Sequence, residues 1–363
     1  VISRGSTFAY KGKDVDLTKV ASDLGVRFIL QGSARWGKER VRISAQLTDT
    51  ASGGNLWAEK FDRDTADLFT LQDELTEEIV RAIEPQIGQF ERNRAARIPP
   101  SNLDVWGLYH LGLARYYENT SESFERATEH FDNAIELDPN FAPAFAMAAA
   151  SRANLVLFGK PEDREQLLET AKDQSARAVS LAPNEPICII ADAQIHNFFG
   201  QYDIAIEKLR HALKANPNSG LALFQLGYSY LVSGQAEQAI EHFQQLQRLS
   251  PHDALATGWI TMISIALFDL GRYEEAVAHA RHATARPNSR LWAHVFLAAS
   301  LHQLGRQDEA EEVFVRVYSM APSFSLQFVR KAGIHWAPKI RANRLKLLKE
   351  AGVPEHPIGQ MQE

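Results

Sequence analysis

Four side chains in this 363-residue sequence have types and spacings that could support chemistry. Asp62 and Asp64 flank Arg63 after a strand-like run, and paired carboxylates can act as general acid and base. His279 and His282 lie three residues apart, so both could face one metal ion from a helix. Acidic residues often mark turns, and no third metal ligand is evident beside the histidines. We therefore favour a solvated strand end for the aspartates and solvent-facing positions for the histidines.

The glycines and the cysteine give no stronger signal. Gly53-Gly54 has neither the spacing of a phosphate-binding loop nor the Lys-Ser/Thr that follows one. Cys188 is the only cysteine, which excludes an internal disulfide framework and a cysteine-based zinc cluster. Its favoured role is that of a small, buried apolar residue. We predict no catalytic residues, no metal site and no cofactor.

The chain contains an internal repeat between Tyr109 and Ser323, and Cys188, His279 and His282 lie within it. A series of alanines recurs along the chain, with successive members separated by 44, 34, 34, 37 and 34 residues. A series of prolines keeps the same step and closes each unit, and a series of glycines divides the units. A period near 34 residues with two helical patterns per unit is typical of a helical solenoid, which usually binds partners. The alanines are Ala127, Ala171, Ala205, Ala239, Ala276 and Ala310; the prolines are Pro139, Pro183, Pro217, Pro251, Pro287 and Pro322; the glycines are Gly159, Gly200, Gly234, Gly271 and Gly305.

The unit from Pro217 to Pro251 shows how one repeat would fold. Its first helix would end at Gly234 and its second helix at Pro251. Small residues such as Gly227 and Ala239 would let the two helices approach closely. Each helix has only about three turns, so each unit must bury its apolar stripe against its neighbours. The first stripe consists of Leu223, Leu226, Gly227 and Tyr230, and the second of Ala239, Phe243 and Leu246.

These residues resemble the tetratricopeptide repeat. The family pattern of a large residue, Leu-Gly, an aromatic, a turn glycine, an alanine, an aromatic and a proline recurs along the array. We count six units; the first has a longer loop at Asn119 to Ser123, and the second has extra residues around Gly159 to Arg164. The best match reads Leu223, Leu226, Gly227, Tyr230, Gly234, Ala239, Phe243 and Pro251.

The N-terminal region has a different pattern. Residues 17–24 are predicted to form a helix, with Asp16 as its N-cap and Gly25 as its end. Alternating runs at 27–36 and 40–47 predict a hairpin, and residues 55–61 a third strand. Residues 70–90 predict an amphipathic helix in which Pro85 could cause a kink. The predicted fold class is therefore mainly α, a helical solenoid preceded by a small, partial α+β domain.

Motifs in this region resemble the TolB amino-terminal-like domain. In bacteria, that domain commonly precedes tetratricopeptide repeats in class III adenylate or guanylate cyclases and in some winged-helix transcriptional regulators. The family's opening strand and helix are missing here, and no segment resembles the two metal-binding aspartates of a cyclase domain. The motifs are Val-Ile-Ser-Arg at 1–4, Ser-Thr-Phe at 6–8, Gln-Gly-Ser at 31–33, Ala-Gln-Leu at 45–47 and Leu-Trp-Ala-Glu at 56–59.

The composition limits the partners and the surroundings of the chain. A net charge of −6 and an isoelectric point near 6.1 argue against nucleic acid as the main partner. The longest apolar runs, such as residues 259–268, are too short to span a bilayer, and no signal peptide opens the sequence. We expect a cytoplasmic location, or a periplasmic one if a transmembrane helix precedes Val1. The start inside a strand-like run suggests a fragment of a longer chain.

The tetratricopeptide resemblance also predicts a binding surface. In that family the concave groove is lined by outward-facing residues of each first helix, and the matching positions here are apolar or uncharged. An apolar helix or extended protein segment is therefore the expected ligand. Packing of the aromatic residues between neighbouring hairpins is the equally favoured alternative. The positions are Gln194, Asn197, Phe198, Phe224, Tyr228, Leu231, Thr261, Ile265, Phe268, Val295, His302 and Gln303.

The C-terminal region is predicted to contain a helix after Pro338. Its apolar stripe suits the capping helix that a solenoid needs at its open end. Its basic residues could meet an acidic partner, but we favour a solvated face. The stripe consists of Ile340, Leu345 and Leu348, and the basic residues are Lys339, Arg341, Arg344, Lys346 and Lys349.

Two hypotheses on function follow. In the first, the chain is a non-catalytic regulatory and interaction module of a cyclase-type signalling protein, with an effector domain upstream in the same polypeptide as one partner. In the second, it is the equivalent module of a winged-helix transcriptional regulator. The predicted organisation is a partial α+β domain at 1–96, a linker at 97–102, the repeats at 103–323, and capping helices with a tail at 324–363.

Overall fold

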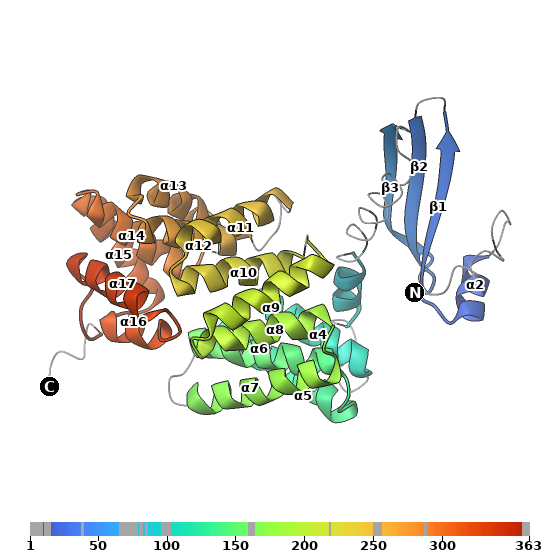
Figure 1. Cartoon of the computed structure of the whole chain (residues 1–363), viewed down its shortest axis with the longest axis horizontal. Helices are drawn as coiled ribbons and strands as arrows, with labels where there is room; N and C mark the ends of the chain where they lie inside the picture. Colours follow the sequence, from blue (N-terminus) through green and yellow to red (C-terminus); the bar gives the residue numbers. More distant parts are fainter. Residues whose placement is uncertain are drawn as a thin grey trace. The chain divides into compact units, whose positions relative to one another are not determined.

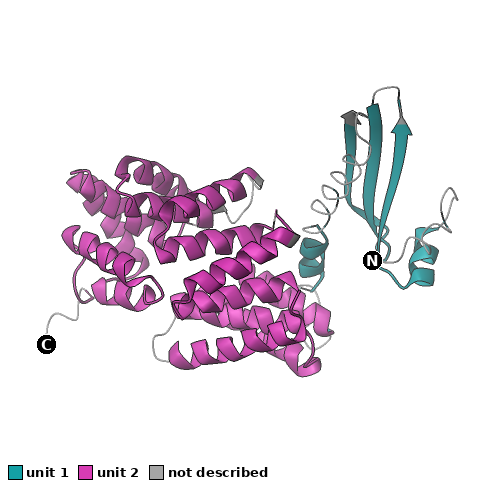
Figure 2. Cartoon of the chain, in the orientation of Figure 1, with its two compact units in different colours: residues 1–103 teal, residues 104–363 magenta. Residues whose placement is uncertain are grey.

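The computed structural model describes residues 10, 16–37, 40–64, 79, 83, 86–95, 103–158, 164–217, 219–249, 256–286 and 289–357. The chain forms two compact units, residues 1–103 and 104–363, which are coloured separately in Figure 2. The predicted linker at 97–102 and the prolines at positions 251 and 287 lie outside the described residues.

The first unit begins with α2 (Leu17–Leu24), whose ends are those predicted. The Asp16 carboxylate accepts a hydrogen bond from the backbone N–H of Thr18, and Gly25 ends the helix with φ 63°. A three-stranded antiparallel sheet follows in the order β1 (Phe28–Trp36), β2 (Arg40–Asp49) and β3 (Gly54–Asp64). The hairpin and the third strand were predicted, although β3 extends three residues beyond the predicted end.

Alternation along β2 gives the sheet its buried face. Val41, Ala45 and Phe61 are almost fully buried and pack together, with Trp57 half-buried beside them. Residues 86–95 are helical, and Phe90 meets Phe28 of β1 edge to face. Most of the predicted helix at 70–90, including Pro85, lies outside the described residues.

The second unit consists of helical hairpins stacked in chain order (Figure 1). Each hairpin is one predicted repeat, so the prediction of a solenoid of about six hairpins is confirmed. The first helices of the six repeats are α4 (Val105–Glu118), α6 (Ala142–Phe158), α8 (Pro186–Phe198), α10 (Gly220–Ser233), α12 (Ala256–Asp269) and α14 (Leu291–Gln303). The second helices are α5 (Ser121–Leu137), α7 (Arg164–Leu181), α9 (Tyr202–Ala215), α11 (Ala236–Leu249), α13 (Tyr273–Thr284) and α15 (Gln307–Met320).

The turn between the two helices of a repeat needs a left-handed residue. In the fourth repeat Gly234 adopts φ 92°. This conformation is energetically unfavourable for any residue that has a Cβ atom. The first repeat has Asn119 at this place, with φ 59°, and asparagine tolerates that region better than most residues. The longer loop predicted after Asn119 is instead compact, because Thr120 caps α5 through a reciprocal pair of hydrogen bonds with Ser123.

Small residues allow the two helices of a hairpin to pack closely. A Cβ added at Gly227 would lie 2.8 Å from the Phe243 ring, and one at Gly112 would lie 2.5 Å from the Phe131 ring. Both distances are shorter than real contacts. The predicted alanine series also lies in the core: Ala127, Ala171, Ala205, Ala239 and Ala276 are fully buried, and Ala310 is 2% exposed.

The first helices form the inner layer of the array. Each one contacts the first helix of the next repeat as well as the second helix of its own hairpin. We call the surface formed by α4, α6, α8, α10, α12 and α14 the inner surface. The chain ends with α16 (Leu326–Ala332) and α17 (Pro338–Glu350), and α17 begins at the predicted proline.

Candidate protein-interaction surface

The predicted groove residues lie on four first helices of the inner surface. Gln194, Asn197 and Phe198 belong to α8, and the others belong to α10, α12 and α14. Their role in binding a partner remains a prediction. Gln194, Asn197, Phe198, Leu231, Thr261, Ile265, Phe268 and Val295 are buried, whereas Phe224, Tyr228, His302 and Gln303 are half-buried.

Side-chain amides form a ladder across the first helices. Asn154 of α6 donates to the Tyr116 hydroxyl of α4 over 3.0 Å and accepts from Gln194 of α8 over 3.0 Å. Gln225 of α10 donates to Gln194 over 3.3 Å. One turn further along α8, the amide of Asn197 donates to the Ser229 hydroxyl over 2.8 Å. These bonds link the first helices of repeats one to four, although the amide oxygens of Asn197 and Gln225 are buried without a hydrogen-bond partner.

Two of the predicted groove residues, Phe224 and Tyr228, are only partly available to a ligand. The Phe224 and Tyr228 rings stack with centroids 6.5 Å apart, and Phe224 also packs on Phe243 of α11. Phe224 therefore packs in part within its own hairpin, and the alternative interpretation, packing between neighbouring hairpins, remains a prediction. Tyr228 faces a different neighbour, which lies 107 residues further along the chain.

That neighbour is the C-terminal segment, which lies on the inner surface. We call residues 324–355 the strap. Its helix α16 contacts α6 of the second repeat, and its backbone and side chains reach α8, α10, α12 and α14. The strap residues Leu326, Val329, Leu348 and Val353 are buried in the same core as repeats three to six. The strap thus lies on the same helices as the predicted groove residues and contacts two of them, Phe198 and Tyr228.

His335 is the central contact of the strap. Its Nε2 lies 2.6 Å from the Tyr228 hydroxyl, and its ring packs on Tyr228 and Phe198. Its backbone carbonyl accepts a hydrogen bond of 3.0 Å from the Tyr202 hydroxyl. Burial, reinforced by the positive charges of Arg164 and Arg344, lowers the pKa of His335 to about 3. The imidazole is therefore neutral at physiological pH.

Arg344 is the second anchor of the strap, and its burial corrects an expectation from the sequence. The side chain, expected on a solvated face, is 2% exposed and forms an ion pair with Asp269 at the end of α12, which is 4% exposed. Two hydrogen bonds of 3.0 and 2.6 Å join the groups. The guanidinium also lies 4.4 Å from the centroid of the Trp336 ring, a cation–π contact. The other four basic residues of α17 are exposed or half-buried.

The residues considered for catalysis or metal binding do not form a catalytic or metal site in the described part of the chain. Asp62 pairs with Arg42 on the exposed surface of the sheet, and the Asp64 side chain is outside the described residues. Burial lowers the pKa of His279, but no group of three potential metal ligands occurs among the described residues. Cys188 is fully buried, as predicted, and burial raises the pKa of its thiol to about 12.

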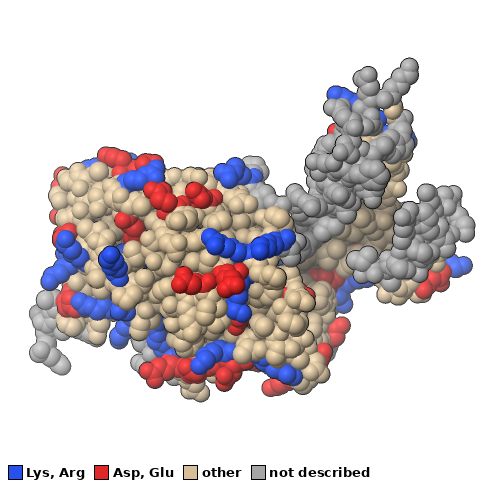
Figure 3. Space-filling model, viewed as in Figure 1, with Lys and Arg blue, Asp and Glu red and all other residues tan. Residues whose placement is uncertain are grey.

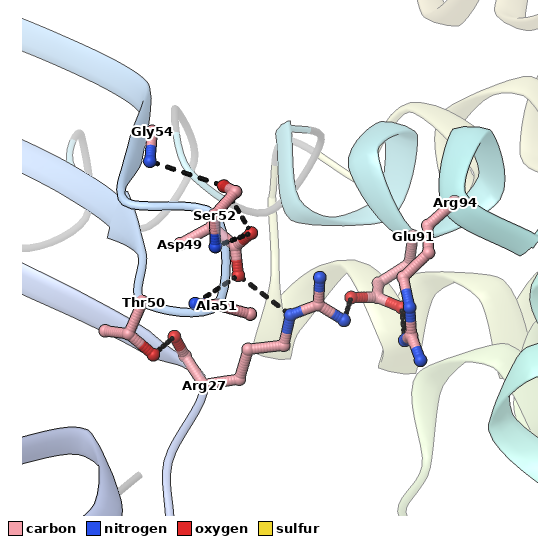
Figure 4. A network of polar contacts seen from close by, with 8 residues as sticks. All are labelled: Arg27, Asp49, Thr50, Ala51, Ser52, Gly54, Glu91 and Arg94. Atoms are coloured by element: carbon pink, nitrogen blue, oxygen red, sulfur yellow. Dashed lines mark hydrogen bonds and ion pairs between the residues drawn. The ribbon is translucent and has the colours of Figure 1, made fainter. Parts of the chain in front are cut away.

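A polar network in the first unit joins the sheet to the helical residues 86–95 (Figure 4). Arg27 lies between two carboxylates, 2.8 Å from Asp49 and 2.9 Å from Glu91, and Arg94 also donates to Glu91. Burial favours the neutral acid at Asp49, but hydrogen bonds from Arg27 and Ser52 hold its pKa below the ordinary value. Because every charge in it has a partner, the network fits a structural role better than a catalytic one.

Outside the inner surface, the second unit has a cleft of about 420 Å³ along α9. Arg210 lines it and donates to the Tyr230 hydroxyl over 2.6 Å. Charges of both signs line it, and Figure 3 shows Lys and Arg interspersed with Asp and Glu over the described part of the face in view. None of the described helices is long and apolar enough to cross a membrane. The lining residues are Asp203, Ile206, Glu207, Arg210, His211, Lys214, Tyr230 and Gln235.

Comparison with known proteins supports the repeats. Residues 194–254 and 261–323 match the family model of the tetratricopeptide repeat. Among solved structures, a thermophilic tetratricopeptide repeat protein of Thermus thermophilus is 18% identical, with a TM-score of 0.44 over 54% of this chain and 98% of that chain. The resemblance of the first unit to the TolB-like domain remains a prediction.

Two curated relatives belong to different functional classes. "Putative adenylate cyclase 3" of Rhizobium meliloti is 40% identical over 149 residues, which are 40% of this chain and 25% of that protein. The transcriptional regulator HilA of Salmonella typhimurium is 22% identical over 214 residues, which are 57% of this chain and 38% of that protein. The aligned part thus spans about a quarter of the cyclase relative's length.

Proposed function

We propose that this chain is a non-catalytic interaction module of a bacterial signalling protein of the adenylate or guanylate cyclase type. The observation that carries this proposal is the 40% identity to the Rhizobium protein, together with a tetratricopeptide array that presents helices rather than a reaction centre. Such an array binds through surfaces made of several repeats. The repeats would dock a protein segment, and an effector domain of the same polypeptide is one candidate partner.

The chemistry of the inner surface favours a protein segment as the ligand. Its predicted groove residues are apolar or uncharged, so they suit an apolar helix or an extended segment rather than a phosphate backbone. The net charge of −6 also disfavours nucleic acid. A cytoplasmic location fits this function, and a periplasmic one would require a membrane-spanning helix elsewhere in the polypeptide.

The second candidate function is that of the regulatory part of a transcriptional regulator. The alignment with HilA favours it, because that alignment covers 57% of this chain, a larger share than the cyclase relative covers. The lower identity of 22% makes it the weaker of the two candidates. In either case the chain would act by binding protein.

An activity assay tests the non-catalytic part of the proposal. The purified chain is incubated with ATP or GTP and magnesium or manganese, and cyclic nucleotide is measured by mass spectrometry. We expect no product above a buffer control. Turnover that a point substitution within this chain abolishes would contradict the proposal.

A binding assay tests the interaction part. Segments of the full-length polypeptide outside these 363 residues are titrated into the chain by calorimetry. We expect one segment to bind saturably, and we expect an unfolded, heat-treated chain not to bind it. If no segment binds, docking of the repeats to an effector domain of the same polypeptide is contradicted.

A further inference from the structure

The strap meets the inner surface through contacts that resemble the recognition of a peptide. The Ala337 N–H donates to the Val232 carbonyl over 2.8 Å, near the end of α10, where helix carbonyls lack intrahelical partners. The His335 carbonyl accepts from the Tyr202 hydroxyl, and the Lys331 carbonyl accepts from Arg164. The repeats thus bind the strap backbone at three points, in addition to its side chains.

The strap is also joined to itself. The backbone N–H groups of Leu326 and Gln327 donate to the carbonyls of Pro354 and Glu355 over 2.8 and 3.1 Å, and Arg330 pairs with Glu355. Its first and last residues are therefore tied together. A segment closed in this way can leave a surface as one unit, as locally cooperative parts of proteins do.

On release, the polar anchors of the strap regain water, whereas the buried side chains of Leu326, Val329 and Leu348 lose their packing, so an incoming segment must replace both kinds of contact. Arg344 and Asp269 are both buried, so the pair regains its hydration when the strap leaves. The Tyr228 hydroxyl and the His335 imidazole can likewise exchange their mutual hydrogen bond for bonds to water. An opened inner surface would present the Asp269 carboxylate and the aromatic residues Phe198, Tyr228 and Trp292.

We propose that the strap is an internal ligand of the inner surface, and that the partner of the array is a protein segment of the same chemistry that competes with it. That segment carries an arginine for Asp269 and an aromatic or imidazole side chain for the Phe198–Tyr228 pair. The inference rests on the proposed interaction function and specifies its site and its regulation. Partner binding requires the strap to open.

The test uses a fluorescein-labelled synthetic peptide of residues 324–357, titrated into full-length chains and followed by fluorescence anisotropy. A chain with Arg344→Ala has a weakened strap and an intact Asp269, so we expect saturable binding of the peptide. The unmodified chain should bind it at least about tenfold more weakly, because an attached strap competes at high effective concentration. A peptide that itself carries Arg344→Ala should bind at least about tenfold more weakly than the unmodified peptide.

A disulfide lock provides the matched control. A Cβ built at Gly234 lies 3.0 Å from Cγ1 of Ile340, so Gly234→Cys with Ile340→Cys places two thiols close together. The single Gly234→Cys variant measures the strain that φ 92° imposes on a residue with a Cβ. Added to the Arg344→Ala chain, the oxidised lock should abolish peptide binding and the reduced form should restore it. The same preparation then serves as its own control.

Absence of binding to a folded Arg344→Ala chain, or equal binding to the oxidised and reduced lock, would overturn the proposal. Folding is checked by helical circular dichroism. If Arg344→Ala unfolds the chain, Leu345→Asp replaces it, because Leu345 is half-buried, a carboxylate there weakens the strap with less damage to the core, and Ile340 stays available for the lock. This titration needs no external partner, so its failure is distinct from a failure of the interaction function.

Discussion

The guanidinium of Arg344 and the carboxylate of Asp269 form a two-point ion pair that joins α17 to the end of α12, 75 residues earlier in the chain. Both groups are almost completely removed from water. A buried ion pair of this kind contributes little net stability, yet the loss of one partner leaves an uncompensated charge. The pair therefore specifies where the strap lies more than it stabilises the fold.

Replacing one member of this pair should destabilise the chain, whereas replacing both with apolar residues should not. We expect Arg344→Met or Asp269→Leu alone to lower the free energy of unfolding by up to about 3–5 kcal/mol. The double variant should equal or exceed the wild type in its urea midpoint. A double variant that loses as much as the two single variants together would show that the charges are not coupled.

The pair between Arg152 and Asp132 is the matched control for that experiment. It joins α6 to α5 with similar geometry, but its side chains are 14% and 36% exposed. Because water screens such a pair, Asp132→Leu should lower the free energy of unfolding by only ~1 kcal/mol.

Two neighbouring alanines of α13 test the packing of the repeats. Ala276 is fully buried against its hairpin partner, and Ala278 is exposed. Ala276→Leu should overpack the hairpin and cost ~1–3 kcal/mol, whereas Ala278→Leu should leave stability nearly unchanged. Chemical denaturation measures both, and equal midpoints would mean that the alanine series does not mark the close contact.

Acid should weaken the fold through His335. Its pKa is lowered to about 3 in the folded chain and is about 6.5 when unfolded. The unfolded state therefore binds a proton first, so this contribution is intact above pH 6.5 and is lost as the pH falls towards 3. The slope is at most about 1.4 kcal/mol per pH unit for this group.

A substitution separates His335 from the other histidines. His335→Gln should reduce the loss of stability between about pH 6.5 and 5. His130, His242, His279 and His294 keep part of the slope, because burial also lowers their pKa values. An unchanged pH profile in the His335→Gln chain would show that the imidazole is accessible to protons in the folded state.

The Cys188 thiol should be inert in the folded chain. It is fully buried, and its pKa is raised to about 12, so almost no thiolate is present at about pH 8. A thiol reagent such as Ellman's should react with it only at the rate of unfolding and should react rapidly in urea. Immediate stoichiometric reaction of the native chain would place the thiol at the surface.

Local signals made much of the fold predictable. The ends of α2 were predictable because the Asp16 side chain caps its first turn and Gly25, in a left-handed conformation, ends the helix. The hairpins follow from Gly234 and from small residues such as Gly227, because each repeat is specified within about 34 residues of sequence. These features depend on contacts between residues that are near in the sequence or one repeat apart.

The position of the strap was not predictable in this way. Arg344 reads as one of five basic residues on a surface helix, and its partner Asp269 belongs to another repeat. Their meeting depends on how the whole array curves, which the repeat pattern does not specify. The available signal was the aromatic content of the segment, in which His335, Trp336 and Phe328 follow the last repeat without the pattern of a seventh.

Native-state hydrogen exchange, read by mass spectrometry at low denaturant, tests most directly whether the strap covers the inner surface as a separate unit. We expect the strap amide of Ala337, which donates to Val232 of α10, to exchange through an opening that leaves the amides of α10 protected. Asp269→Asn should speed that exchange at least about tenfold, whereas Asp132→Asn should not. Exchange of the strap and of α10 with one common opening free energy in all three chains would show that the strap is an inseparable part of the core.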